Sequence, residues 1–91
     1  PGKVRPGLRS DALVQNIDYA PTFLEMAGAR PYPGIQGRSL LPVLTGAPPR
    51  DWREAVYYRY TGEDVHNVAA HDGVRTRRHK LVRFPWTDEW N

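Results

Sequence analysis

The first half of the chain carries hydrophobic residues at helical spacing. Between residues 19 and 27 they recur every three or four positions and form one apolar stripe, made of Ala20, Phe23, Leu24 and Ala27. This pattern predicts a short amphipathic helix. Asp18 precedes it as a candidate cap for the free amides of the first turn, and Gly28 follows where helices often end in a left-handed residue. The stripe needs an apolar partner, so we expect this chain on its own to pack loosely or to associate.

A second, shorter apolar run covers residues 40–44 and predicts another helix. Ser39 precedes the run as a candidate cap, and Gly46 follows it as a stop signal. Proline then becomes frequent in residues 47–50, which mark the best candidate boundary in the chain. We therefore divide the sequence into residues 1–46 and residues 47–91.

The second half changes to a pattern typical of strands. Residues 55–60 are rich in tyrosine, and residues 72–76 and 80–84 form two further candidate strands joined by a tight turn. In the last strand Val82 and Phe84 share one face, which we expect to be the inner one because arginine at position 83 is poorly suited to burial. The chain is thus predicted to form short helices followed by a small antiparallel sheet, an α+β arrangement.

Composition limits what these elements can build. With 91 residues, 40% of them hydrophobic, the chain suits a packed protein with one small core. It has no cysteine, which excludes disulfides, thiolate metal sites and a cysteine nucleophile within these residues. It also has no apolar run near the roughly 20 residues that a membrane-spanning helix needs. Because it does not begin with Met, we expect it to be a piece of a longer protein.

The formal net charge of +3 is unevenly distributed along the chain. Basic residues gather in one late segment, at Arg75, Arg77, Arg78, His79, Lys80 and Arg83. The favoured interpretation is the solvated face of a strand, because basic and apolar residues alternate there. Contact with a polyanion is the second interpretation, and composition leaves both open.

Few residues offer catalytic chemistry. The chain has three histidines, His66, His71 and His79. The spacing of His66 and His71, with only Asp72 near, is not that of a metal site. His71 beside Asp72 fits a general acid–base pair, although a hydrogen-bonded surface histidine at the start of a strand is the favoured interpretation. Neither Ser10 nor Ser39 stands in a G-x-S-x-G nucleophile motif, so we assign no catalytic and no metal-binding residue.

Four motifs together resemble those of a known family. They are the pattern N-I-D-x-x-P-T-x-L-x-x-x-G at residues 16–28, Gly37-Arg38-Ser39-Leu40, Val74-Arg75-Thr76 and Lys80-Leu81. The first resembles the late helix of the alkaline-phosphatase-like superfamily, and the combination is similar to the C-terminal region of sulfatases. When Tyr57-Tyr58, His71 and Trp90 are added, the chain is most similar to the subgroup that includes N-acetylglucosamine-6-sulfatases and related glycan sulfatases.

The resemblance implies an α/β parent protein, with a large mixed sheet between helices and a smaller C-terminal subdomain of antiparallel strands. Residues 1–46 would be the end of its catalytic domain, and residues 47–91 the start of the subdomain. Such enzymes use a formylglycine made from Cys or Ser in a C/S-x-P-x-R motif, beside a calcium ion held by carboxylates. Neither motif occurs here. We therefore expect this chain to bind no cofactor itself, to be inactive alone, and to have the remainder of the sulfatase chain as its partner.

The resemblance also implies hydrolysis of a sulfate ester on a sulfated sugar or glycan. Within this chain it points to His71 and Arg75, which would hold the sugar, with Gly73 letting the backbone turn closely enough to present His71. The alternative is that His71 caps the strand and Arg75 pairs with a carboxylate.

Several further expectations follow from the same resemblance. No nucleic-acid partner and no membrane span are expected, and the family implies a periplasmic or extracellular location. Two rival functions stay open. One is a phosphonate or phosphodiester hydrolase of the same superfamily, and the other is a free-standing basic module that binds sulfated glycan or nucleic acid.

Overall fold

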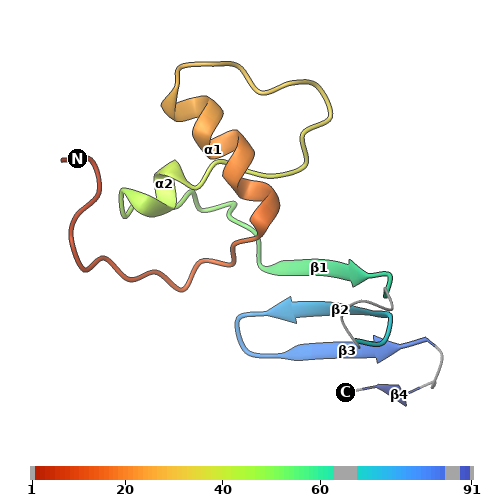
Figure 1. The fold of residues 1–91 in the computed structure, drawn as a ribbon. Helices are drawn as coiled ribbons and strands as arrows, with labels where there is room; N and C mark the ends of the chain where they lie inside the picture. Colours follow the sequence, from red (N-terminus) through yellow and green to blue (C-terminus); the bar gives the residue numbers. More distant parts are fainter. Residues whose placement is uncertain (1, 63–67, 86–88, 91) are drawn as a thin grey trace. The chain divides into compact units, whose positions relative to one another are not determined.

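The computed structural model describes residues 2–62, 68–85 and 89–90 of the chain. The chain divides into two compact units, Pro1–Arg53 and Glu54–Asn91. The first unit contains a 3₁₀ helix, η1 (Asn16–Asp18), and the helices α1 (Tyr19–Met26) and α2 (Leu41–Leu44). The second contains the strands β1 (Ala55–Tyr60), β2 (His71–Thr76), β3 (Lys80–Phe84) and β4 (Glu89–Trp90). Short helices followed by an antiparallel sheet confirm the predicted α+β arrangement (Figure 1).

Helix α1 lies where the sequence predicts it. Gly28, two residues after the end of the helix, has a φ of +69°, the left-handed conformation expected of a helix stop. The face that α1 buries carries Pro21 and Thr22. This chain covers the predicted apolar stripe only in part, because Leu24 is half-buried and Phe23 is 66% exposed.

The core of the first unit forms around helix α2. Its buried apolar residues are Leu40, Val43 and Trp52. Ser39 lies just outside α2, and its hydroxyl oxygen accepts a hydrogen bond from the backbone N–H of Leu41 at 3.2 Å. Ser39 therefore satisfies one free amide of the first turn, but the N-cap residue is Leu40, so the prediction that Ser39 itself caps the helix is wrong.

Trp52 extends the first unit beyond the boundary expected from the sequence. Its ring packs in the core, and its indole N–H donates to the carbonyl oxygen of Leu13 at 3.0 Å. The compact unit therefore runs to Arg53, whereas the proline-rich segment suggested a boundary after residue 46. The assignment of the two parts to a catalytic domain and a subdomain stays a prediction.

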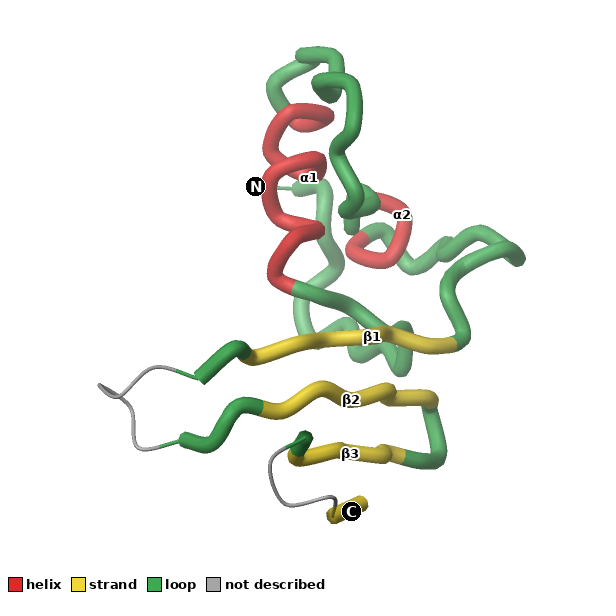
Figure 2. Tube along the Cα trace, turned by 90° about the vertical axis from the view of Figure 1, so that its right-hand side faces the viewer, coloured by secondary structure: helices red, strands yellow, loops and turns green. Residues whose placement is uncertain are grey.

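The sheet of the second unit has the strand order β1-β2-β3-β4, with every pair antiparallel (Figures 1 and 2). Half-buried and exposed residues alternate along β1, so Tyr58 and Tyr60 share the half-buried face and Tyr57 lies on the other. Val82 stands opposite Gly73, as Tyr58 does, which places Val82 on the half-buried face. Val82 and Phe84 are both half-buried, but so is Arg83 on the other face, so the prediction that Val82 and Phe84 face the core stays a prediction.

The described helices are all short. None of them has the length and apolar character needed to cross a bilayer.

Candidate functional site

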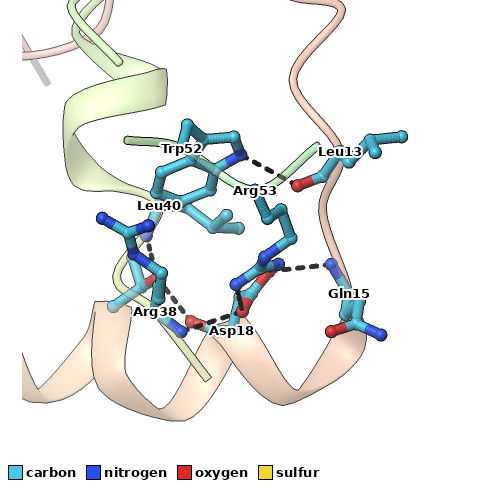
Figure 3. Close-up of polar contacts among 8 residues, drawn as sticks. Leu13, Gln15, Asp18, Arg38, Leu40, Trp52 and Arg53 are labelled. Atoms are coloured by element: carbon cyan, nitrogen blue, oxygen red, sulfur yellow. Dashed lines mark hydrogen bonds and ion pairs between the residues drawn. The ribbon is translucent and has the colours of Figure 1, made fainter. Parts of the chain in front are cut away.

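A buried carboxylate ties together three segments of the first unit (Figure 3). Asp18, which is fully buried, accepts hydrogen bonds from the backbone N–H groups of Gln15 at 2.8 Å and Arg38 at 2.9 Å. The guanidinium of Arg53 binds the same carboxylate through both terminal nitrogens, one of them at 2.8 Å. No bond goes from this carboxylate to the first turn of α1, so the predicted capping role of Asp18 is wrong. A charge-assisted, two-pronged bond to arginine is stronger than a bond to a neutral amide, and it decides the orientation of the side chain.

Thr22 and Gly37 bring the same segments into close contact. The Thr22 hydroxyl donates to the carbonyl oxygen of Asp18 at 2.6 Å and accepts from the backbone N–H of Leu40 at 2.7 Å. A Cβ atom on Gly37 would lie 1.9 Å from the carbonyl oxygen of Ile17, so only glycine permits this approach. We call this group the Asp18 clasp; it consists of Asp18, Thr22, Gly37, Arg38 and Arg53. Most of its members belong to the motifs of the family resemblance, which therefore have a structural role here.

The electrostatics of the Asp18 clasp leave no place for a metal ion. Burial by itself would raise the pKa of Asp18, but the hydrogen bonds from Arg53, Arg38 and Gln15 outweigh it and hold that pKa below its usual value. The carboxylate is therefore ionised and compensated by the charge of Arg53. Its two oxygens accept four hydrogen bonds, which uses the lone pairs that a metal would need.

The second unit has a hollow at the end of the sheet where β1 ends and β2 begins. Its volume is about 270 Å³, and its lining includes Arg59, Tyr60, His71, Asp72 and Arg83. His71, which the sequence predicts to hold a sugar, thus lies in a concave and charged surface. The hydroxyl of Tyr60 is buried and has no hydrogen-bond partner among the described residues. We call this surface the sheet-end hollow.

His71 is held in one orientation by its neighbours. Its ring lies among three aromatic side chains, at centroid distances of 5.7 Å from Tyr58, 5.5 Å from Tyr60 and 5.6 Å from Phe84. Its Nδ1 lies 2.8 Å from the carbonyl oxygen of Ala69. Because a carbonyl only accepts, Nδ1 carries the proton, and in the neutral ring Nε2 is the acceptor. His71 is therefore hydrogen-bonded at the start of β2, which was the favoured interpretation of the sequence.

Asp72 does not orient the His71 ring, which argues against the acid–base pair, the less favoured of the two interpretations of the sequence. Successive residues of a strand point to opposite faces, so the side chains of His71 and Asp72 lie on opposite faces of the sheet. On its own face, Asp72 forms ion pairs with an arginine from each neighbouring strand. The register places Arg59 opposite Asp72 and Asp72 opposite Arg83. Arg83 binds the carboxylate at 2.9 Å and 3.2 Å, and the nearest nitrogen of Arg59 lies at 3.7 Å.

The sequence interpretation missed Arg59 and Arg83 as members of the site. Each is a basic residue in an alternating strand, and that pattern is also typical of a solvated face. The signal that identifies them is the cross-strand register, which depends on where both hairpin turns fall.

Gly73 has a different role from the one predicted. It lies in the middle of β2, and a Cβ atom there would approach the Tyr58 ring and the carbonyl oxygen of Leu81, both at 2.8 Å. The missing side chain therefore gives room to the Tyr58 ring. The prediction that Gly73 makes the backbone turn to present His71 is wrong, because the strand continues through it.

Arg75 is on the same strand as His71 but is not part of the sheet-end hollow. Four residues separate the two, which corresponds to roughly 13 Å along a strand. Arg75 is exposed and forms no ion pair with any carboxylate that the structure describes. The structure thus keeps the two predicted sugar-binding residues apart. Their roles in binding stay predictions.

Metal-binding side chains do not cluster in the described part of the chain. In residues 2–62, 68–85 and 89–90, no three residues of the types His, Cys, Asp and Glu come together in a way that could hold an ion. His66 lies outside the described residues.

Comparison with known proteins identifies the family. The family described as "N-sulphoglucosamine sulphohydrolase, C-terminal" matches residues 1–91. An N-acetylglucosamine-6-O-sulfatase of Bacteroides thetaiotaomicron is 45% identical over 99% of this chain and 17% of its own length. The human N-acetylglucosamine-6-sulfatase is 44% identical over 66% of the chain and 11% of its own length.

A solved structure supports the same relationship. It is described as a complex with its substrate D-glucosamine-2-N,6-O-disulfate, and it superposes with a TM-score of 0.85 at 44% identity. The match covers 96% of this chain and 18% of that one, so the chain spans less than a fifth of the length of these relatives. The chain therefore belongs to the family of N-sulphoglucosamine sulphohydrolase C-terminal regions.

Proposed function

We propose that the intact protein containing this chain is a sulfatase that hydrolyses a sulfate ester of a sulfated amino sugar. The observation that carries the proposal is the 45% identity to an N-acetylglucosamine-6-O-sulfatase over 99% of the chain. The substrate named in the related solved structure, a glucosamine disulfate, belongs to the same class of sugar. These matches do not favour the phosphonate or phosphodiester hydrolase, nor the free-standing binding module.

We assign the sheet-end hollow as the part of this chain that holds the sugar. The Arg59–Asp72–Arg83 row lies on the opposite face of the strands from His71, and the two meet in the lining of the hollow at the sheet end, where guanidinium groups suit an anionic sugar. His71 adds an acceptor at Nε2 in a fixed orientation, which suits a sugar hydroxyl or amide N–H. These groups bind and orient, and the described residues that line the hollow include no nucleophile.

The reactive groups of the family are proposed to lie outside this chain. Formylglycine would supply the nucleophile for sulfur and calcium would stabilise the charged oxygens, as the family resemblance implies. Neither of the carboxylates that are buried in the described part of the chain fits the calcium ion, because Asp18 and Asp72 are both bound by guanidinium groups. We therefore propose that this chain is inactive alone and that its partner is the remainder of the sulfatase chain. A periplasmic or extracellular location is part of the same proposal.

Sulfate release by the intact protein tests this function. N-acetylglucosamine 6-sulfate should be hydrolysed, whereas a phosphonate ester and a phosphodiester should be poor substrates. Efficient cleavage of either phosphorus compound without sulfate release would contradict the proposal.

The role of His71 is tested by comparing two substrates of one variant. His71→Ala should lower kcat/KM for the sugar sulfate about tenfold, the value of one hydrogen bond, and leave a small aryl sulfate unchanged. The ratio of the two activities does not depend on how much of the variant is folded. His79→Ala is the matched control, because His79 lies in the turn of the same hairpin, away from the hollow. Equal losses on both substrates would remove His71 from the sugar site.

A further inference from the structure

The hairpin formed by β2 and β3 ends in a dense group of cations. We call this group the basic tip. Its members are all exposed and are Arg75, Arg77, Arg78, His79 and Lys80. It lies at the opposite end of β2 from His71 and lines no part of the sheet-end hollow.

The basic tip is unfavourable for the stability of the isolated sheet. The register places Arg75 directly opposite Lys80, and like charges in that position repel. None of the ion pairs among the described residues involves the tip. On the other face of the same sheet, a carboxylate separates two arginines, because Asp72 lies between Arg59 and Arg83. No carboxylate among the residues that the structure describes pairs with the tip, so an anion from elsewhere would relieve the repulsion.

The backbone that carries these cations is well held. The Thr76 hydroxyl oxygen accepts hydrogen bonds from the N–H groups of Arg78 at 3.3 Å and His79 at 3.0 Å. The backbone N–H of Thr76 also donates to the carbonyl oxygen of His79 at 2.8 Å. A closed turn presents its side chains from defined positions, which lowers the entropy cost of binding.

The side chains of the basic tip favour a ligand that is recognised through ionic contacts and not through stacking. Single-stranded nucleic acid is bound through aromatic side chains on which bases stack. Tyr58, Tyr60 and Phe84 gather around His71 instead, roughly 13 Å along the strand from Arg75, and Tyr57 lies on the other face of the sheet from Arg75. That distance exceeds the size of a single sugar, so one monosaccharide cannot occupy both places.

We propose that the basic tip binds sulfate and carboxylate groups of an extended sulfated glycan, outside the site that holds the reacting sugar. The inference rests on the proposed function and deepens it, because it makes the preferred substrate a chain and not a free monosaccharide. The ligand is recognised by anionic groups that repeat along a polymer.

Heparin binding by the intact protein tests the proposal. The tip variant Arg77→Gln/Arg78→Gln/Lys80→Gln should bind heparin about tenfold more weakly, the combined effect of three exposed ionic contacts. The slope of log affinity against log salt concentration should fall by about 2, since each lost contact releases roughly 0.7 fewer ions on a single-stranded polyanion. The matched control is Lys3→Gln/Arg5→Gln/Arg9→Gln, which removes the same charge from exposed positions of the first unit. The control should keep its affinity and salt slope.

Further variants separate geometry from net charge. The charge-preserving variant Arg77→Lys/Arg78→Lys/Lys80→Arg should bind heparin as the native protein does, which also shows that the hairpin tolerates substitution. The tip variant should hydrolyse N-acetylglucosamine 6-sulfate at the same rate as the native protein, which shows that the site for the reacting sugar is intact.

Heparin affinities of the tip variant and the control variant decide whether the proposal holds. Loss of heparin affinity in the tip variant alone supports the proposal. Unchanged affinity in the tip variant, equal loss in tip variant and control, or tighter binding to single-stranded DNA than to heparin overturns it. The heparin-binding measurement requires no turnover. A protein that fails to hydrolyse the monosaccharide therefore refutes the proposed function, while heparin binding by the tip can still be measured.

Discussion

Replacing Asp18 by asparagine tests whether the Asp18 clasp holds the first unit together. The carboxylate is fully buried and its partner Arg53 is 14% exposed, so their interaction is poorly screened by water. Asp18→Asn keeps the size of the side chain but leaves the positive charge of Arg53 without its counter-ion. Breaking a buried ion pair from one side typically costs about 3–5 kcal/mol of unfolding free energy. We expect a loss in that range.

The measurement is the urea or thermal unfolding of the intact protein and its variants. Asp51→Asn is the matched control, since Asp51 also pairs with an arginine, Arg38, at 3.4 Å, but its side chain is 80% exposed. An exposed pair of this kind contributes at most about 1 kcal/mol. If Asp18→Asn costs no more than Asp51→Asn, the clasp is not the main tie between these segments.

The stability loss caused by Asp18→Asn should depend on pH. The pKa of Asp18 is lower in the folded protein than the unfolded value of about 3.9, so its ionised form stabilises the fold above that pH. This stabilisation is lost as the pH falls through the folded-state pKa. The difference in stability between native protein and Asp18→Asn should therefore be constant near neutral pH and shrink below about pH 4. A difference that persists unchanged in acid would show that the charge of Asp18 is not its cause.

Two glycines provide further tests. Gly37→Ala should be strongly destabilising, because its Cβ would lie 1.9 Å from the carbonyl oxygen of Ile17 and the two backbone segments would have to separate; thermal unfolding should show it, and an unchanged midpoint would contradict the predicted contact. Gly73→Ala should cost about 1–3 kcal/mol by displacing the Tyr58 ring, and the double variant with Tyr58→Ala should cost less than the sum of the two single changes. Strict additivity would show that the ring does not occupy that space.

The local elements could be predicted from the sequence because their causes are local. The period of the apolar residues placed α1, and alternation placed β1. Gly28 marked the end of α1, since its preference for positive φ belongs to the residue itself. The motifs that resemble sulfatases were likewise readable without coordinates, and the family match covers the whole chain.

The partners of the polar residues were decided only by the tertiary structure. Asp18 satisfies a helix-capping pattern, yet its carboxylate binds Arg53, a residue 35 positions away. Such a contact depends on the path of the chain, and a buried charge selects the strongest partner that this path brings near.

The same reason applies to the candidate site. His71 and Asp72 are adjacent in sequence, but the pleat of the strand sends them to opposite faces, and the register gives Asp72 to Arg83. His71 and Arg75 share a face but lie toward opposite ends of β2. Sequence by itself determined which residues carry charge and which elements carry them. The pairing of strands decided which of those charges meet, because register is a property of two segments and not of either one alone.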